Sequence, residues 1–61
     1  MANITEKELM AISDLLSMEE NLVSKYRACA CAAGDEALRS VYEQTAQRHQ
    51  RHYDELYANL K

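Results

Sequence analysis

The sequence predicts an all-α protein: an antiparallel two-helix hairpin that is expected to dimerise into a four-helix bundle. Three observations predict it. The 61 residues contain no proline and a single glycine, Gly34, and they are rich in helix-forming alanine, leucine and glutamate. Apolar residues recur at spacings of three and four on both sides of that glycine. Each apolar stripe is also wider than one partner helix can cover, so we expect a single domain, residues 1–61, that pairs with a second copy.

The first helix is expected over about residues 6–33. Thr5 and Glu8 have the T-x-x-E spacing of a capping box, in which each side chain bonds the backbone N–H of the other residue. The apolar face of this helix is marked by Leu15, Leu16, Leu22, Val23 and Tyr26. At about 100° per residue, Glu19 falls in the middle of that face. Because an unpaired buried carboxylate is costly, Glu19 is expected to have a partner.

The second helix is expected over about residues 36–60. Gly34 suits the left-handed position that follows many helices, and Asp35 is a favourable N-cap. So short a connection makes the two helices antiparallel neighbours. The stripe of the second helix consists of Leu38, Tyr42, Thr45, His49, Tyr53, Leu56 and Leu60, and its flanks carry Val41, Ala46, His52 and Tyr57.

His49 is central on the second helix, as Glu19 is on the first. Both residues lie fifteen positions from Gly34, one before it and one after it, so they are predicted to face each other at equal height. The same rule places Tyr26 opposite Tyr42. Three interpretations of Glu19 and His49 remain open: a hydrogen-bonded pair that fixes the register without a ligand, a metal site, or a pair displaced to a solvated edge.

Counting possible ligands limits the metal interpretation. Two copies would supply two Glu19 and two His49, which suits one borderline ion such as zinc. The di-iron sites of ferritin-like bundles need a Glu three residues before the His, and that position is Ala46. Glu43 lies about 120° from the stripe centre and is a poor substitute. His52 completes an H-x-x-H spacing that can chelate, but it lies about 60° off centre, so the predicted metal residues are Glu19 and His49 alone.

Charge and composition exclude several functions. The net charge is −3 with both signs interspersed, whereas nucleic-acid binding needs a clustered cationic surface. No apolar run approaches the roughly 20 residues that span a bilayer, and residues 1–8 do not resemble a signal peptide, so we expect a soluble, intracellular chain that binds no membrane. No Ser or Cys has an evident base and orienting acid, so we expect no enzyme and no resident cofactor.

The two cysteines, Cys29 and Cys31, are two residues apart and would point about 200° from each other on a helix. An intrachain disulfide is therefore not expected. Cys29 should lie at the edge of the apolar face and Cys31 near solvent. They are interpreted as small helix-filling residues, with intermolecular links through Cys31 as the alternative.

Three segments, ITEKEL, DLLSMEENLVSKY and AQRHQRHYDELYANL, together resemble the coat F domain family of spore-coat-type proteins of endospore-forming bacteria. The similarity spans Ile4 to Leu60 and is most specific in M-E-E-N-L-x-x-K-Y, Met18–Tyr26, and A-x-x-H, Ala46–His49. The resemblance implies a ferritin-like helical hairpin, association with the spore or its coat, and no established catalytic activity.

These observations lead to one main expectation and two alternatives. The main one is a non-catalytic structural or interaction protein of the spore coat, a homodimer that also contacts other coat proteins. The first alternative is a ferritin-like metal-binding module with a degenerate site formed by Glu19 and His49 across a dimer. The second is an adaptor whose hairpin pairs with a different helical protein.

Overall fold

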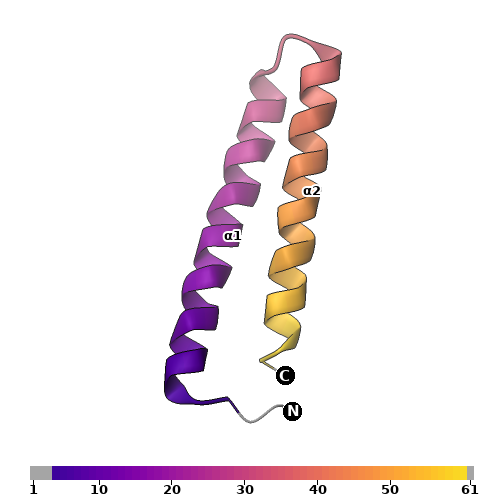
Figure 1. Cartoon of the computed structure of the whole chain (residues 1–61). Coiled ribbons are helices and arrows are strands. Elements are labelled where there is room, and N and C mark those ends of the chain that lie inside the picture. Colours follow the sequence, from indigo (N-terminus) through magenta and orange to yellow (C-terminus); the bar gives the residue numbers. More distant parts are fainter. Residues whose placement is uncertain (1–3, 61) are drawn as a thin grey trace.

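Two long α-helices pack side by side in the computed structural model of this protein, which describes residues 4–60. Helix α1 spans Glu6–Ala32 and α2 spans Glu36–Ala58, and Figure 1 shows them running antiparallel, with the start of α1 and the end of α2 at the same end of the hairpin. No strand occurs within the described range. The hairpin measures 46 × 16 × 10 Å. The predicted all-α hairpin is therefore confirmed, while residues 1–3 and 61 of the predicted domain lie outside the described part.

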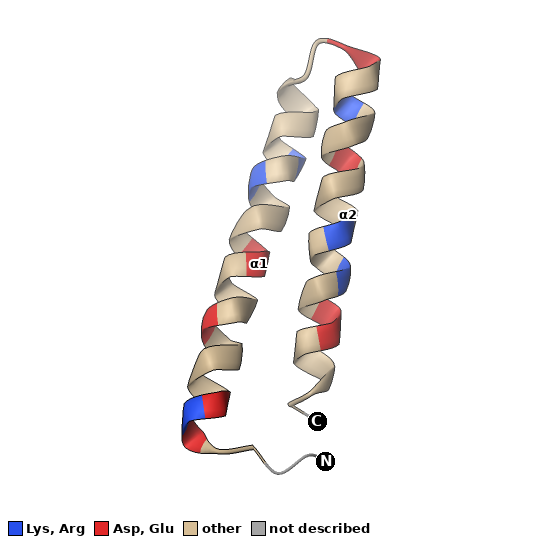
Figure 2. Ribbon diagram, in the orientation of Figure 1, with Lys and Arg blue, Asp and Glu red and all other residues tan. Residues whose placement is uncertain are grey.

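The capping box that predicted the start of α1 is formed. The backbone N–H of Glu8 donates to Thr5 Oγ1 at 3.1 Å, and the backbone N–H of Thr5 donates to Glu8 Oε1 at 3.0 Å. The bond from the Thr5 backbone, and secondly the Thr5 hydroxyl, lower the pKa of Glu8 below its usual range. Figure 2 shows acidic residues at the first turns of both helices, where they complement the positive end of the helix dipole.

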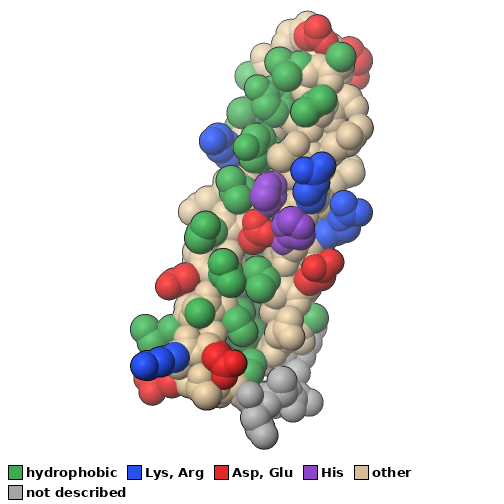
Figure 3. All heavy atoms as spheres, viewed as in Figure 1, with side chains coloured by type: hydrophobic (Ala, Val, Ile, Leu, Met, Phe, Trp, Pro, Cys, Tyr) green, Lys and Arg blue, Asp and Glu red, His purple; other side chains and the backbone are tan. Residues whose placement is uncertain are grey.

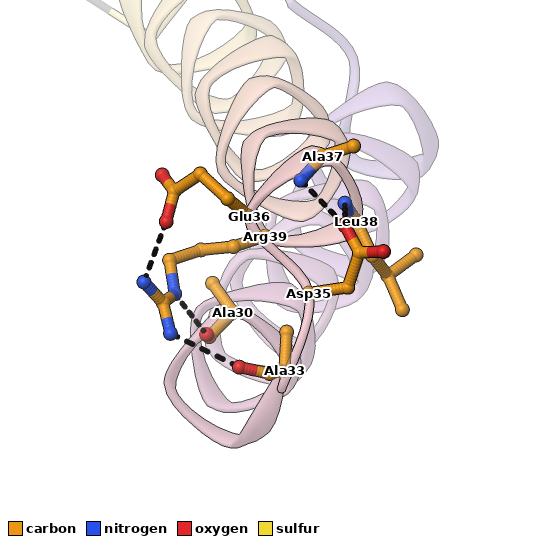
Figure 4. Close-up of polar contacts among 7 residues, drawn as sticks. All are labelled: Ala30, Ala33, Asp35, Glu36, Ala37, Leu38 and Arg39. Atoms are coloured by element: carbon orange, nitrogen blue, oxygen red, sulfur yellow. Dashed lines mark hydrogen bonds and ion pairs between the residues drawn. The ribbon is translucent and has the colours of Figure 1, made fainter.

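Helix α2 begins at the predicted N-cap. Asp35 Oδ1 accepts hydrogen bonds from the backbone N–H groups of Ala37 at 2.7 Å and Leu38 at 3.2 Å (Figure 4). The helix ends at Ala58, two residues before the predicted end. There the backbone N–H of Asn59 bonds the carbonyl of Leu56, the tighter i→i−3 pattern that commonly closes a helix.

The turn between the helices differs from the prediction. Gly34 does not adopt a left-handed conformation, and the chain leaves α1 through an extended Ala33, with φ −68° and ψ 129°. The carbonyl of Ala30 accepts from the backbone N–H of Ala33, and a side chain of α2 also bonds the carbonyls at this end. Arg39 Nη2 donates to the carbonyl of Ala33 at 3.0 Å and Arg39 Nε to that of Ala30 at 3.3 Å (Figure 4). Because the guanidinium satisfies these acceptors, the left-handed glycine turn that would otherwise do so is not needed.

The interface between the helices is thin. Its buried hydrophobic residues are Val23, Ala30 and Ala46, and no large side chain among residues 4–60 is fully buried. Ala46, predicted on a flank of the stripe, is only 3% exposed, whereas Leu38, predicted within the stripe, is 45% exposed. Small side chains let the helix axes approach closely, so the contact line of α2 runs nearer Ala46 than the apolar stripe alone indicates.

The hairpin has two unlike broad faces. On one, which we call the apolar face, two rows share spacings of three, four and seven residues: Leu15, Met18, Leu22 and Cys29 on α1, and Leu38, Val41, Thr45 and His52 on α2. Figure 3 shows this face, with hydrophobic side chains over both helices and the two histidines between them. The opposite face carries an open groove of about 900 Å³, whose charged lining residues are Arg27, Arg39, Glu43 and Arg51. Within residues 4–60, neither helix is long and apolar enough to cross a membrane.

Candidate functional site

Glu19 of α1 and His49 of α2 are in direct contact at the middle of the hairpin. His49 Nδ1 lies 2.8 Å from Glu19 Oε1, and the two side chains are 13% and 22% exposed for Glu19 and His49 respectively. The ring centroids of Tyr26 and Tyr42 lie 6.2 Å apart, as the same counting rule predicted. Both pairings are therefore confirmed. The low exposure of Glu19 also contradicts the interpretation of a pair displaced to a solvated edge.

His52 joins the same carboxylate, which the sequence analysis did not predict. Its Nδ1 lies 3.0 Å from Glu19 Oε2, so the two oxygens of one carboxylate each contact a different imidazole. The side chain of His52 is 47% exposed, in keeping with its place on the flank of α2. The H-x-x-H spacing was the signal that could have found it. Counting angles between Cα positions does not find this contact, because the His52 side chain extends from the flank of α2 towards Glu19.

Ring packing holds His49 in place. Its imidazole stacks on Tyr26, with centroids 6.0 Å apart and planes 8° from parallel, and meets the His52 ring edge-on at 5.5 Å. Tyr26 stacks in turn with Tyr42. Such contacts restrict the rotamer of His49, so its ring nitrogens are presented to Glu19 with little conformational freedom.

The hydrogen bonds define where the protons lie. An ionised carboxylate only accepts, so in the hydrogen bond between His49 and Glu19 the proton lies on Nδ1 of His49, whereas His52 is close enough to Glu19 for an ion pair. In a neutral imidazole this leaves Nε2 without a proton, and in a charged one both nitrogens carry a proton. Because both oxygens of Glu19 are engaged, this partly buried carboxylate is satisfied without any ligand. The cluster therefore suffices as a register-fixing contact between the helices.

The same three residues also have the composition of a metal site. One donor atom from each of Glu19, His49 and His52 lies within 4.8 Å of the other two. Two imidazoles and a carboxylate are a common donor set for zinc and for other first-row divalent ions. Glu43 lines the groove on the opposite face, and Ala46 is buried between the helices. The bridging carboxylates of a di-iron centre are therefore not present around this cluster in the described chain.

The cysteines lie where the sequence placed them. Both thiols are free, with Cys29 partly buried and Cys31 exposed. Cys31 lines the groove on the face opposite the cluster.

Comparison with known proteins does not assign the chain to a family. No family model matches the chain, and no curated protein or solved structure is significantly similar to it.

Proposed function

We propose that this protein is a non-catalytic, self-associating structural module, in which two hairpins bury their apolar faces against each other and form a four-helix bundle. The observation that carries this proposal is the mismatch between the core and the surface. Among residues 4–60, two of the three buried hydrophobic residues are alanines, whereas Leu15, Met18, Leu38 and Val41 are between 44% and 58% exposed on one face. Chains this short rarely fold alone on so small a core, and oligomerisation is a usual remedy.

The size of the apolar face suits a second copy. The hairpin is 46 Å long and 16 Å wide, so its broad face has a projected area of roughly 700 Å², the scale of a standard interface. Stable interfaces bury about 800 Å² per partner. The two apolar rows lie side by side over residues 15–29 of α1 and 38–52 of α2, which is a surface that the same rows of a second hairpin can cover. A homodimer therefore matches this face better than a short peptide would.

Sedimentation equilibrium of the purified chain tests the proposal, with Val41→Glu as the disrupting variant. A charge at position 41 would be buried in the bundle, so we expect a dimeric wild type and a monomeric or unfolded variant. Gln47→Glu adds the same charge to an exposed position of α2 on the groove side and should leave the dimer intact. A wild type that is monomeric and folded at ~100 μM would overturn the proposal and favour an adaptor for another helical protein.

The motif resemblance supports a cellular location for this module. Because the segments Met18–Tyr26 and Ala46–His49 resemble those of coat F domain proteins, we propose that the bundle is a small building block of the bacterial spore coat, in contact with other coat proteins. A fluorescently tagged copy expressed in a sporulating host should gather at the developing spore. Uniform fluorescence in the mother-cell cytoplasm throughout sporulation would contradict the coat assignment while leaving the dimer proposal untouched.

A further inference from the structure

We propose that Glu19, His49 and His52 form a binding site for one divalent transition-metal ion of the zinc type. All three ligands come from a single chain, two from α2 and one from α1, so the proposal does not depend on dimerisation. It differs from the sequence-based metal hypothesis, which needed two copies and left His52 out.

The distances in the cluster are close to those of a metal site. Zinc bonds to imidazole nitrogen and carboxylate oxygen at about 2.0–2.2 Å, so the donors around a tetrahedral ion are about 3.3 Å apart. The three donor atoms already lie within 4.8 Å of one another. Small side-chain rotations bring them to bonding distance, and the exposed side of His52 leaves room for water as the fourth ligand.

Metal binding would displace protons from the cluster. Metal coordination requires a free lone pair on each ligating nitrogen, so if Nδ1 of His49 binds the ion it must lose the proton that it now donates to Glu19. In a neutral imidazole that proton moves to Nε2, and in a charged imidazole it is released to solvent. The carboxylate then faces a cation where it faced the two imidazole rings. Acidification therefore has to weaken metal binding.

The position of the cluster links metal binding to the proposed dimer. Glu19 is the middle residue of α1, and the cluster lies on the apolar side of the helix contact line. Two hairpins that overlap over their full length bring their midpoints to the same level, so both clusters would lie inside the bundle. Exclusion of water there strengthens the bonds between the charged ligands and the ion. Bound metal should therefore raise the affinity of one hairpin for another. By linkage, dimerisation should raise the affinity for the metal by the same factor.

Calorimetric titration with Zn²⁺ and absorption titration with Co²⁺, each as the metal alone, test the site. A chain carrying Cys29→Ser and Cys31→Ser is used so that thiols do not bind the metal. We expect one ion per chain, a higher melting temperature with metal, and the visible bands of Co²⁺ in a site of low coordination number. Binding should weaken on acidification, because protons compete with the ion for the ligand atoms.

Variants identify the ligands. Glu19→Gln and His52→Gln should each weaken Zn²⁺ binding at least tenfold, whereas Glu20→Gln, an exposed neighbour, should not change it. His52 is the most exposed member of the cluster, so its replacement is the least disruptive to folding, and circular dichroism confirms the helix content. Equal Zn²⁺ affinity in the wild type, Glu19→Gln and His52→Gln, or no saturable binding by a folded wild type, would overturn the proposal. Binding by a monomeric Val41→Glu chain would separate this site from the dimer.

Discussion

Glu19 and His49 lie 30 residues apart in the sequence and 2.8 Å apart in space, and this contact joins the middles of the two helices. It fixes the register of the hairpin because a slip of one helical turn, about 5.4 Å, would separate the carboxylate from both imidazoles. Apolar contacts between alanine, valine and leucine would tolerate such a slip more readily. The polar cluster therefore specifies one alignment of two otherwise similar helices.

The strength of this contact can be measured with a double-mutant cycle on Glu19→Leu and His49→Leu. Each single change should destabilise the fold by about 1–2 kcal/mol, since each removes a charge-assisted hydrogen bond and leaves a partly buried polar partner. The double variant should lose about 1 kcal/mol less free energy of unfolding than the two single losses added together, because neither of the two positions then holds an unpaired polar group. Urea unfolding in the presence of a metal chelator supplies the four free energies. Simple additivity within error would mean that the two side chains do not stabilise each other.

Arg39 makes a contact of similar strength at the turn end of the hairpin. Its replacement, Arg39→Met, should cost about 1–2 kcal/mol, because the carbonyls of Ala30 and Ala33 lose their charged donor. Glu36→Gln should cost less than about 0.5 kcal/mol, since its ion pair with Arg39 is exposed to solvent. Thermal unfolding of both variants, with Arg48→Met as the surface control, measures the difference. If Arg39→Met and Arg48→Met melt together, Arg39 does not stabilise the end of α1.

The features that could be predicted from the sequence depend on backbone geometry. The capping box at Thr5, the N-cap at Asp35 and the pairing of Glu19 with His49 all follow from fixed spacings along ideal helices. A turn of three residues leaves little freedom in the register, so counting from Gly34 placed the pair correctly.

The features that could not be predicted depend on where long or flexible side chains turn. Arg39 folds back by nine residues to the carbonyl of Ala30, and no spacing rule for helix faces anticipates that reach. His52 lies on the flank of α2, yet its imidazole meets the second oxygen of Glu19. The rotation of α2 towards Ala46 depends on how closely the two backbones approach, which is a property of the packed pair rather than of either stripe.

The capping box should make the stability of α1 depend on pH. The pKa of Glu8 is lower in the folded chain than its ordinary value, so the ionised carboxylate stabilises the folded state above the unfolded-state pKa, and that stabilisation is lost as the pH falls through the folded-state pKa. Glu8→Gln should therefore melt below the wild type at pH 7, and the gap should close on acidification from about pH 5 towards pH 3. Glu20→Gln, which lies outside the first turn, is the control. A gap that stays constant between pH 7 and pH 3 would contradict this account of the cap.

Gly34→Ala distinguishes the observed turn from the one that the sequence predicted. Gly34 has no positive φ, and a Cβ added there meets no atom within 4 Å. Alanine restricts the unfolded chain more than glycine does, so the substitution should stabilise the hairpin by about 0.4–1 kcal/mol. A left-handed glycine at this position would give the opposite sign, because a side chain is strained there. Chemical denaturation of the two proteins measures the change, and a destabilised Gly34→Ala would show that the turn is left-handed in solution and that Arg39 is not sufficient to end α1.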